Sequence, residues 1–373
     1  MSGRSVAILG AGAGGIAAAA VLARRGHDVR LYNRTPGRIA GLREAGGVEI
    51  EGDLGDGFAA IPTITTDVAE ALSGAELALC CVPAYGQRPL AELAAPHLEP
   101  GAALVLAPGS AGSLEVAQVL AAHGRDVHDE ILLGETVTLP QSARVTPAGR
   151  VRIRLDSAIR MAAFPACNNE RLYAAVGDLI RWRESPNVLD TGIHNVNFLI
   201  HPAPMLLNYA AVERSDGTLS IMNEGMTDGV LRCLDAIDRE KMALATALGL
   251  EPISIDDLYR EAGSGPHIYR ERGEPFGDEG TPRGYRDRIW PRYIDEDTPY
   301  GTVMLSSLGR QLGVPMPACD AVNTLLSVLE RSDFVAGGRT TETLGLAGMS
   351  AAEIRHYLFH GGPRARAALR RRV

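Results

Sequence analysis

The feature of this chain that most restricts its fold is a short apolar strand that runs into a glycine-rich turn and then into a helix. The strand pattern covers Ser5–Leu9, the motif G-x-G-x-x-G occupies residues 10–15, and a helical pattern follows over Ile16–Arg25. This order of strand, turn and helix is the setting in which the motif binds a dinucleotide. It predicts an N-terminal Rossmann domain.

Each glycine of the motif has its own physical role. Gly10 permits the tight turn, Gly12 lets the backbone approach a pyrophosphate, and Gly15 lets the helix pack closely on the strand. The free amides and the positive dipole end of the helix would then bind the phosphates. We therefore predict Gly10, Gly12 and Gly15 as cofactor-binding residues.

The end of the second predicted strand indicates which cofactor is used. The strand Asp28–Tyr32 is followed by Asn33, Arg34 and Thr35, where an NAD-selective enzyme usually has an acidic residue that binds the ribose diol. No acidic residue is present, and Arg34 is suited to a 2′-phosphate, with Asn33 and Thr35 as hydrogen-bond donors. We predict NADP. Use of NAD, or a plain surface role for Arg34, remains the alternative.

Two further apolar runs, at 77–84 and 103–110, predict parallel strands that are covered on both faces. Helical patterns alternate with them, as in a doubly wound α/β sheet. Val82 and Pro83 would lie at the carboxyl end of the first of these strands, where such sheets bind ligands. We therefore predict that both contact the cofactor.

The length of 373 residues suits two domains, each with its own core. Strand patterns give way to helical ones from Pro186 onward. We predict a Rossmann domain over 1–186 and a mostly α-helical substrate domain over 187–373. In the second domain, an amphipathic stretch over Met226–Leu250 predicts a packing helix, and its Lys241, the only lysine, is expected to extend its ammonium to the surface.

Charge and composition exclude several classes of protein. The formal net charge of -8, with basic residues clustered only at Arg364–Arg372, argues against a nucleic-acid partner. No apolar run has the roughly 18 residues of a membrane span, and no secretory signal is evident. We expect a cytoplasmic protein without a metal site, whose five cysteines are buried thiols: Cys80, Cys81, Cys167, Cys233 and Cys319.

One histidine, His201, stands in the apolar run 195–208. An imidazole among apolar side chains loses hydration unless a partner binds it, so such a position is used for chemistry or for a buried hydrogen bond. The residues near His201 leave both interpretations open.

Four motifs resemble those of the opine dehydrogenases, the octopine dehydrogenase family. They occur in the family's order over nearly the whole chain: Glu-Thr-x-Thr-Leu-Pro-x-x-x-Arg at 135–144, Asn-x-Asn-x-x-x-His-Pro at 195–202, and the segments 223–227 and 292–301. The resemblance implies a Rossmann domain followed by a helical domain. It also implies an oxidoreductase that reductively condenses an amino acid with a 2-oxo acid through an imine.

The resemblance also implies roles for three residues. His201 matches the catalytic histidine, Asp297 the carboxylate that orients it, and Arg292 the arginine that binds a substrate carboxylate. The chemistry agrees, because the reaction needs a proton donor, a group that selects its tautomer and a guanidinium that holds the 2-oxo acid.

Other assignments remain open at this stage. His194 competes with His201, and Asp295 and Glu296 compete with Asp297. Arg292 and Asp297 could also form an ordinary surface ion pair. A simple 2-oxo acid or ketopantoate-type reductase, with Lys241 as its acid, is the alternative enzyme, and a non-catalytic dinucleotide sensor is the alternative of another class.

The substrates are not specified by these motifs. Residues 141–143 depart from the aromatic residue expected in relatives, and the segment between Glu261 and Pro299, rich in Gly, Pro, Arg and aromatic residues, predicts a loop that covers the substrate. We expect small-molecule partners, an amino acid and a 2-oxo acid, and a homodimer formed through the helical domain.

Overall fold

The structure is a computed structural model that describes residues 3–146, 150–156, 158–215, 219–222, 224–261 and 292–362, without the side chains of 154–156. The predicted covering loop, apart from its ends, and the basic C-terminal residues 364–372 lie outside this described part, as does Asn223. The chain divides into two compact units, Met1–Gly192 with His356–Val373, and Ile193–Arg355. The sequence prediction has a single boundary at 186/187 and assigns the C-terminal residues to the second domain.

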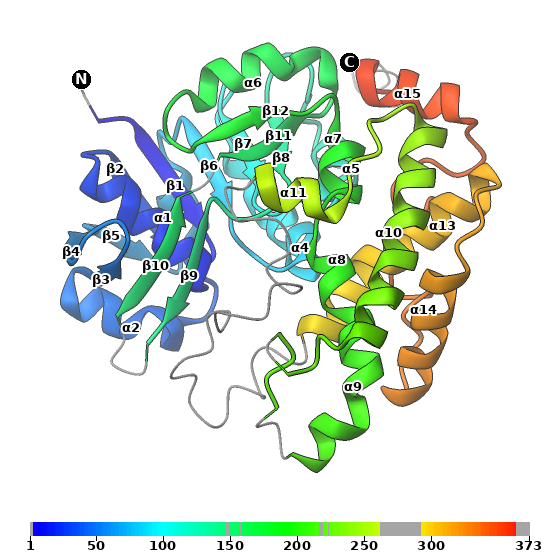
Figure 1. The fold of residues 1–373 in the computed structure, drawn as a ribbon. Coiled ribbons are helices and arrows are strands. Elements are labelled where there is room, and N and C mark those ends of the chain that lie inside the picture. The colour runs from blue at the N-terminus through cyan, green and yellow to red at the C-terminus, as the bar shows by residue number, and fades with distance from the viewer. Residues whose placement is uncertain are drawn as a thin grey trace. The chain divides into compact units, whose positions relative to one another are not determined.

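The first unit is built around an eight-stranded sheet in the order β12-β11-β8-β7-β6-β1-β2-β5 (Figure 1). All of its strand pairs are parallel except β11 with β8. This confirms the predicted Rossmann fold. The strands are β1 (Ser5–Leu9), β2 (Asp28–Tyr32), β5 (Thr63–Thr65), β6 (Leu77–Cys80), β7 (Ala103–Leu106), β8 (Leu132–Thr136), β11 (Ile159–Ala163) and β12 (Trp182–Glu184).

Helices connect these strands. They are α1 (Ala13–Arg24), α2 (Pro36–Ala45), α3 (Val68–Leu72), α4 (Ala84–Ala94), α5 (Gly112–Ala122), α6 (Asn169–Val176) and α7 (Val188–Ile193), with short turns η1 (Ala95–His97) and η2 (Ala166–Asn168).

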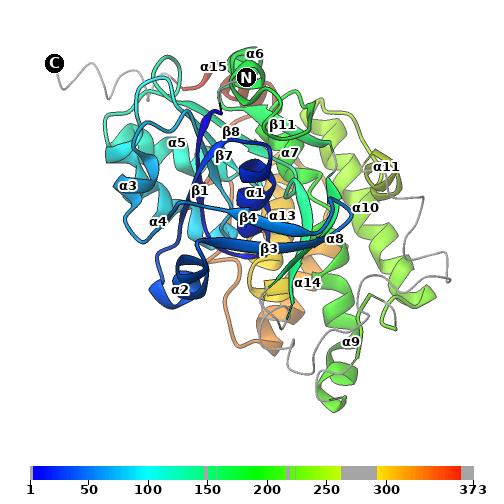
Figure 2. The same cartoon turned by 90° about the vertical axis from the view of Figure 1, so that its left-hand side faces the viewer.

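A second sheet, which the sequence patterns did not separate from the first, packs on α1. Its order is β4-β3-β10-β9, and Figure 2 shows β3 and β4 crossing in front of α1. Its strands come from two distant parts of the chain. The loop that leads into β9 lies at the glycine motif, because an added Cβ at Gly14 would be 2.6 Å from Leu139 Cδ1. The strands are β3 (Gly47–Gly52), β4 (Gly57–Ala60), β9 (Gln141–Val145) and β10 (Val151–Asp156).

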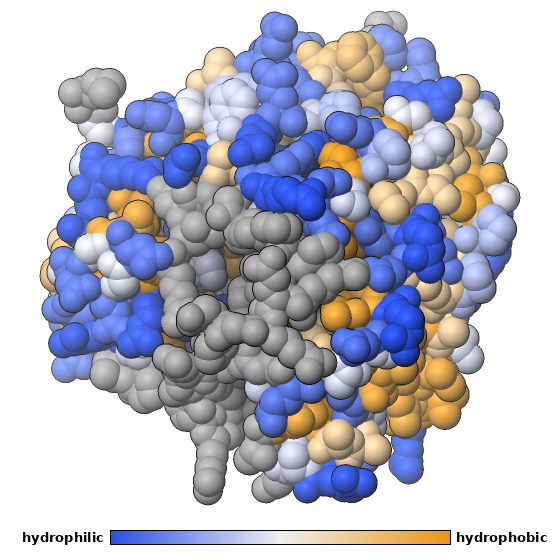
Figure 3. All heavy atoms as spheres, viewed as in Figure 1, coloured by the Kyte–Doolittle hydropathy of each residue, from blue (hydrophilic) through white to orange (hydrophobic). Residues whose placement is uncertain are grey.

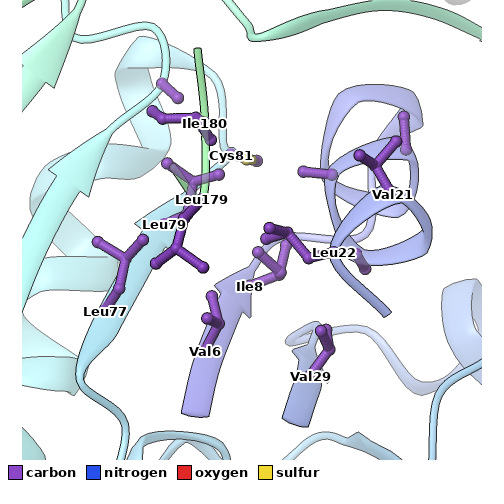
Figure 4. Close-up of a cluster of buried hydrophobic side chains, with 14 of the residues drawn as sticks. Val6, Ile8, Val21, Leu22, Val29, Leu77, Leu79, Cys81, Leu179 and Ile180 are labelled. Atoms are coloured by element: carbon purple, nitrogen blue, oxygen red, sulfur yellow. The ribbon is translucent and has the colours of Figure 1, made fainter. Parts of the chain in front are cut away.

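The core of the first unit lies between β1, its neighbouring strands and α1. Val6 and Ile8 of β1 meet Leu22 of α1, with Leu77 and Leu79 of β6 beside them (Figure 4). All five side chains are buried because parallel strands are covered on both faces. Burying each such side chain contributes about 1.5–3 kcal/mol. This core holds the glycine turn at the carboxyl end of β1.

The second unit is helical, as predicted. Helix α10 packs against α9, α13 and α14, and the apolar stripe that faces them is buried as its periodicity predicts. Among the described residues no helix has the length and hydropathy to cross a membrane. The helices are α8 (Asn197–Ile200), α9 (Pro202–Arg214), α10 (Asp228–Leu248), α11 (Ile255–Glu261), the π-helical η3 (Thr298–Thr302), α13 (Val303–Leu312), α14 (Pro317–Leu329) and α15 (Ala351–His360), within which the two units divide.

The prediction that Lys241 extends its ammonium to the surface was wrong. Its side chain is 0% exposed, its Nζ lies 2.7 Å from Asp238 Oδ1, and it donates a hydrogen bond of 2.7 Å to the carbonyl of Ile253. Asp238 lies one helical turn earlier on α10 and supplies the opposite charge inside the protein. Lys241 therefore has no need to reach solvent.

The expectation that all five cysteines are buried was wrong for two of them. Cys167, in the turn η2, and Cys233, on the outer face of α10, are exposed. An apolar sequence context alone does not place a residue on the inner face of a turn or helix. Cys80, Cys81 and Cys319 are buried, and burial raises the pKa of the Cys80 thiol to about 12. The described residues contain no group of histidines, cysteines and carboxylates arranged to hold a metal ion.

Candidate active site

The glycine turn has the geometry that a dinucleotide requires. Gly10 has a φ of 116°, and an added Cβ there would lie 2.8 Å from the carbonyl oxygen of Cys81. An added Cβ at Gly15 would lie 1.8 Å from the carbonyl oxygen of Gly10, so helix and strand are in contact at this point. At Gly12 an added Cβ would meet nothing within 4 Å.

This open space lies at the N-terminus of α1, where Gly12 is the N-cap and no side chain caps the helix amides. Free amides beside open space are what a pyrophosphate needs. The residues present therefore fit a dinucleotide. Val82 also borders this turn, because its Cγ1 would lie 2.8 Å from a Cβ at Gly10, and Pro83 is the N-cap of α4.

Asn33 has a role that the sequence patterns did not reveal. Its Oδ1 accepts a hydrogen bond of 3.0 Å from the amide of Ala11, inside the glycine motif, and its Nδ2 donates one of 3.1 Å to the carbonyl of Thr35. The side chain thus ties the carboxyl end of β2 to the glycine turn. Its contact with a cofactor phosphate stays a prediction.

Arg34 and Thr35 are exposed after β2, and the exposed Arg38 follows one turn later on α2. Arg34 lies near enough to Tyr32 to act on its charge: burial raises the pKa of the phenol, and the Arg34 guanidinium lowers it. The sequence analysis did not identify Arg38. Its spacing of four residues from Arg34 was the available signal, because it places both arginines near the start of α2. Two exposed arginines therefore lie at this strand end, together with the exposed Asp67, whose charge raises the pKa of Tyr32.

A buried carboxylate shapes the loop after β7. Glu135, at the end of β8, accepts hydrogen bonds from the amides of Ala111 and Ser113 and from the hydroxyls of Ser113 and Thr191, at 2.7–3.0 Å. Burial raises the pKa of Glu135, and these donors lower it. Ser110 and Ala111 have positive φ values of 58° and 63°. Glu135 therefore holds a strained loop at the carboxyl edge of the sheet. The sequence analysis did not identify this role, although a glutamate inside an apolar strand could have indicated it.

His201 and Asp297 are brought together in the second unit. The Nδ1 of His201 lies 2.7 Å from Oδ2 of Asp297, and the two residues are 8% and 6% exposed. His201 occupies the junction of α8 and α9, because Pro202 begins a new helix there. A carboxylate on Nδ1 selects the tautomer that carries its proton on Nδ1, so Nε2 is the atom left for proton transfer.

The π-helical segment that follows Asp297 positions it against α8. An added Cβ at Gly301 would lie 2.2 Å from the ring of the fully buried Phe198, on α8. Thr302 Oγ1 donates a 2.6 Å hydrogen bond to Asn323 Oδ1 of α14, which anchors the segment. Such π-helical turns re-aim the residues around them and are frequent at functional sites.

Arg292 lies on the helical turn that leads to Asp297, but it pairs with a different carboxylate. Its Nε and Nη2 each lie 2.9 Å from Oε2 of Glu296. The Arg292 side chain is 54% exposed and that of Glu296 only 8%. The alternative of a surface ion pair between Arg292 and Asp297 is therefore wrong.

The competing residues have other surroundings. Asp295 is exposed as a residue, but its carboxyl is partly enclosed by protein, and this partial burial together with the Glu330 charge raises its pKa. Glu296 binds Arg292, and His194 is fully buried directly after α7. Among the three acidic residues at 295–297, Asp297 is thus the one bonded to His201. Tyr293, whose ring stacks on that of His201, was missed in the sequence.

Family models match both units. The model described as NAD/NADP octopine/nopaline dehydrogenase, alpha-helical domain, matches residues 184–329. The model of ketopantoate reductase PanE/ApbA matches residues 6–165.

Individual proteins resemble the whole chain. The opine dehydrogenase of Arthrobacter sp. (strain 1C) is 34% identical over 94% of this chain and 98% of its own length. A solved octopine dehydrogenase with NADH and L-arginine has a TM-score of 0.66 at 19% identity and covers 94% of this chain and 97% of its own. An NADP+-bound yersinopine dehydrogenase has a TM-score of 0.66 at 15% identity, over 98% and 99% of the two chains.

Proposed function

The chain belongs to the opine dehydrogenase family, as its motifs predicted, and we propose that it condenses an amino acid with a 2-oxo acid and reduces the product with NADPH. As a family member it is an NAD(P)-dependent oxidoreductase. The observation that carries the proposal is the buried pair of His201 and Asp297. A hydrogen-bonded histidine and carboxylate supply the proton transfers of imine formation and reduction.

His201 acts through Nε2 in this proposal. It takes the proton that the amine loses as it attacks the ketone carbon and returns that proton to the carbonyl oxygen. A second proton, taken up from solvent, then passes to the hydroxyl as it leaves as water. Asp297 keeps the ring oriented and stabilises the imidazolium that forms. The nicotinamide cofactor, when bound, supplies the hydride that reduces the imine carbon. The product is an N-(carboxyalkyl)amino acid.

Arg292 binds the carboxylate of the 2-oxo acid. Its Nε and Nη2 contact Oε2 of Glu296, which holds the guanidinium on the helical turn that carries Asp297. A planar guanidinium edge binds a carboxylate through two parallel hydrogen bonds. Such a contact would hold the reacting carbon in place for reduction.

NADPH is the proposed cofactor because Arg34 and Arg38 put positive charge where a 2′-phosphate would lie. Gly10, Gly12, Gly15 and Val82 would line the pyrophosphate side. Solved relatives carry either cofactor, since octopine dehydrogenase was solved with NADH and yersinopine dehydrogenase with NADP+. The arginines, rather than the fold, therefore favour NADPH here.

A ketopantoate-type reductase is the second candidate, because that family's model matches residues 6–165. Its acid would have been Lys241. The ammonium of Lys241 is fully buried and bound by Asp238 and by the carbonyl of Ile253. This position removes Lys241 as the acid of a ketone reductase and favours His201 as the proton donor.

The test is NADPH oxidation with 2-oxo acids, each with and without a panel of amino acids. Pyruvate and L-arginine are the first pair, since solved octopine dehydrogenases contain them. We expect turnover only when both substrates are present, and a kcat about 100- to 10,000-fold lower in His201→Ala. His356→Ala, an exposed histidine of α15, is the matched control and should keep full activity. Equal turnover without an amine would support the ketone reductase instead.

We also propose a homodimer formed through the helical unit. Figure 3 shows hydrophobic residues on the surface where α14 lies, and Leu325, Val328 and Leu329 of that helix are 51%, 70% and 42% exposed. Clustered apolar side chains on one helix face are typical of protein contacts.

A further inference from the structure

The face of the His201 ring, as well as its edge, has a specific partner. The ring of Tyr293 lies parallel to the imidazole, with 3.6 Å between the ring centroids and 11° between the planes. Tyr293 and Asp297 lie one helical turn apart on the same segment, so one turn of backbone places the phenol on the ring face and the carboxylate on Nδ1.

The stacking geometry discriminates between the two charge states of the imidazole. Carbon atoms in contact lie about 3.5–4.0 Å apart, so a centroid separation of 3.6 Å leaves little lateral offset. Two neutral aromatic rings avoid this face-to-face arrangement because their quadrupoles repel. A cation over the face of a phenol ring is attracted by the same quadrupole.

We propose that Tyr293 is a positioning residue that favours the protonated form of His201 through its ring face, while Asp297 does so through Nδ1. The proposal rests on the proposed function, because it concerns the same proton transfers. In the reaction Tyr293 would stabilise the imidazolium that forms when Nε2 takes the proton of the amine, and would keep Nε2 directed at the substrate.

The other charged groups that the described elements bring near His201 are bound to partners of their own. Arg292, on the same turn, is paired with Glu296. Helices α8 and α9 bring no charged residue beside His201 in sequence. The buried charges of α10, which packs on α8, bind one another or the first amides of α14: Asp238, Glu240 and Lys241. Among the described residues, Tyr293 and Asp297 are thus the groups whose contacts with the imidazole act on its charge.

The test follows the His201 ring proton by NMR in histidine-labelled enzyme, together with steady-state kinetics. In the native protein we expect this resonance to be shielded by the Tyr293 ring. In Tyr293→Leu the shielding should disappear, and the resonance should titrate about 0.5–1.5 pH units lower, because removing a group that favours the cation makes protonation harder. The kcat should fall about three- to thirtyfold, with the KM of both substrates unchanged.

Three controls separate the ring face from other effects. Tyr293→Phe keeps the face and should stay close to native. Tyr209→Leu, which removes another tyrosine of the helical unit, should leave the His201 resonance unchanged. Pentafluorophenylalanine at position 293 fills the same space with an electron-poor face. The His201 resonance should then titrate at lower pH than in Tyr293→Phe. This comparison tests the proposal even if Tyr293→Leu does not fold.

The outcomes distinguish this proposal from the proposed function. An unshielded native resonance, an unchanged titration in Tyr293→Leu, or an equal loss in Tyr293→Phe would overturn the role of Tyr293. Absence of opine-forming activity in the native enzyme, with the NMR results as expected, would overturn the reaction and leave the stacking intact.

Discussion

At the scale of single residues, the site depends on pairs in which one side chain fixes another. Asp297 orients His201, Glu296 orients Arg292, and Asn33 orients the amide of Ala11. In each pair, a hydrogen bond between the two residues fixes a group that is expected to meet a ligand. The effects of removing the holding residues therefore identify what each pair does.

Glu296 gives the first prediction at this scale. Glu296→Ala frees the Nε edge of Arg292, and we expect the KM for the 2-oxo acid to rise roughly tenfold because the guanidinium loses its orientation. The KM for NADPH should not change. Asp295→Asn, an exposed neighbour on the same turn, is the matched control. A lower KM in Glu296→Ala would mean that Glu296 competes with the substrate carboxylate.

Arg34 gives the second prediction at the scale of single residues. Arg34→Ala should raise the KM for NADPH about 10- to 150-fold, since a hydrogen-bonded charge pair contributes about 1.5–3 kcal/mol, and should leave the KM for NADH unaltered. Initial rates with each cofactor measure this. Arg88→Ala, an exposed arginine of α4, serves as the control. If both cofactors were weakened equally, the 2′-phosphate contact would be disproved.

At the scale of elements, the glycines of the strand–helix turn have separable roles. An added Cβ at Gly15 would clash with the Gly10 carbonyl, so Gly15 is needed for contact between helix and strand. An added Cβ at Gly12 would meet only open space. Gly15 thus serves packing, and Gly12 borders the open space that we assign to the pyrophosphate.

Substitution of these two glycines should separate stability from binding. Gly15→Ala should lower the free energy of unfolding by about 1–3 kcal/mol, because helix and strand must move apart. Gly12→Ala should unfold at the same temperature as the native protein. It should nevertheless bind NADPH weakly, since the methyl occupies the space of the pyrophosphate. Thermal unfolding and cofactor fluorescence titration measure the two effects. Native-like cofactor binding by Gly12→Ala would contradict the assignment of this space.

At the scale of the whole molecule, the predicted cofactor residues and the predicted catalytic residues lie in different units. The first holds the glycine turn and the arginines after β2, and the second holds His201, Asp297 and Arg292. The second unit also carries the exposed apolar face of α14, which argues for association between copies.

Association through α14 can be measured directly. We expect a dimer in sedimentation velocity at micromolar concentration, and Val328→Glu should shift it to a monomer because a charge would be buried at the contact. Glu92→Lys, an exposed change on α4, should leave the dimer intact. A native protein that sediments as a monomer would refute the dimer.

The sequence by itself determined the Rossmann domain, the helical second domain and the family. The glycine turn, the apolar strands and the helical stripes depend on residues close together in the chain, so local spacing reports them. The motif resemblance also predicted roles for His201, Asp297 and Arg292.

Only the tertiary structure decided which side chains meet. His201 and Asp297 are 96 positions apart, and their 2.7 Å contact depends on how α8 packs against the π-helical segment. The pairing of Arg292 with Glu296, the stacking of Tyr293 and the burial of Lys241 arise in the same way. Such contacts depend on the direction of side chains after helices pack, which neighbouring residues in the sequence do not specify.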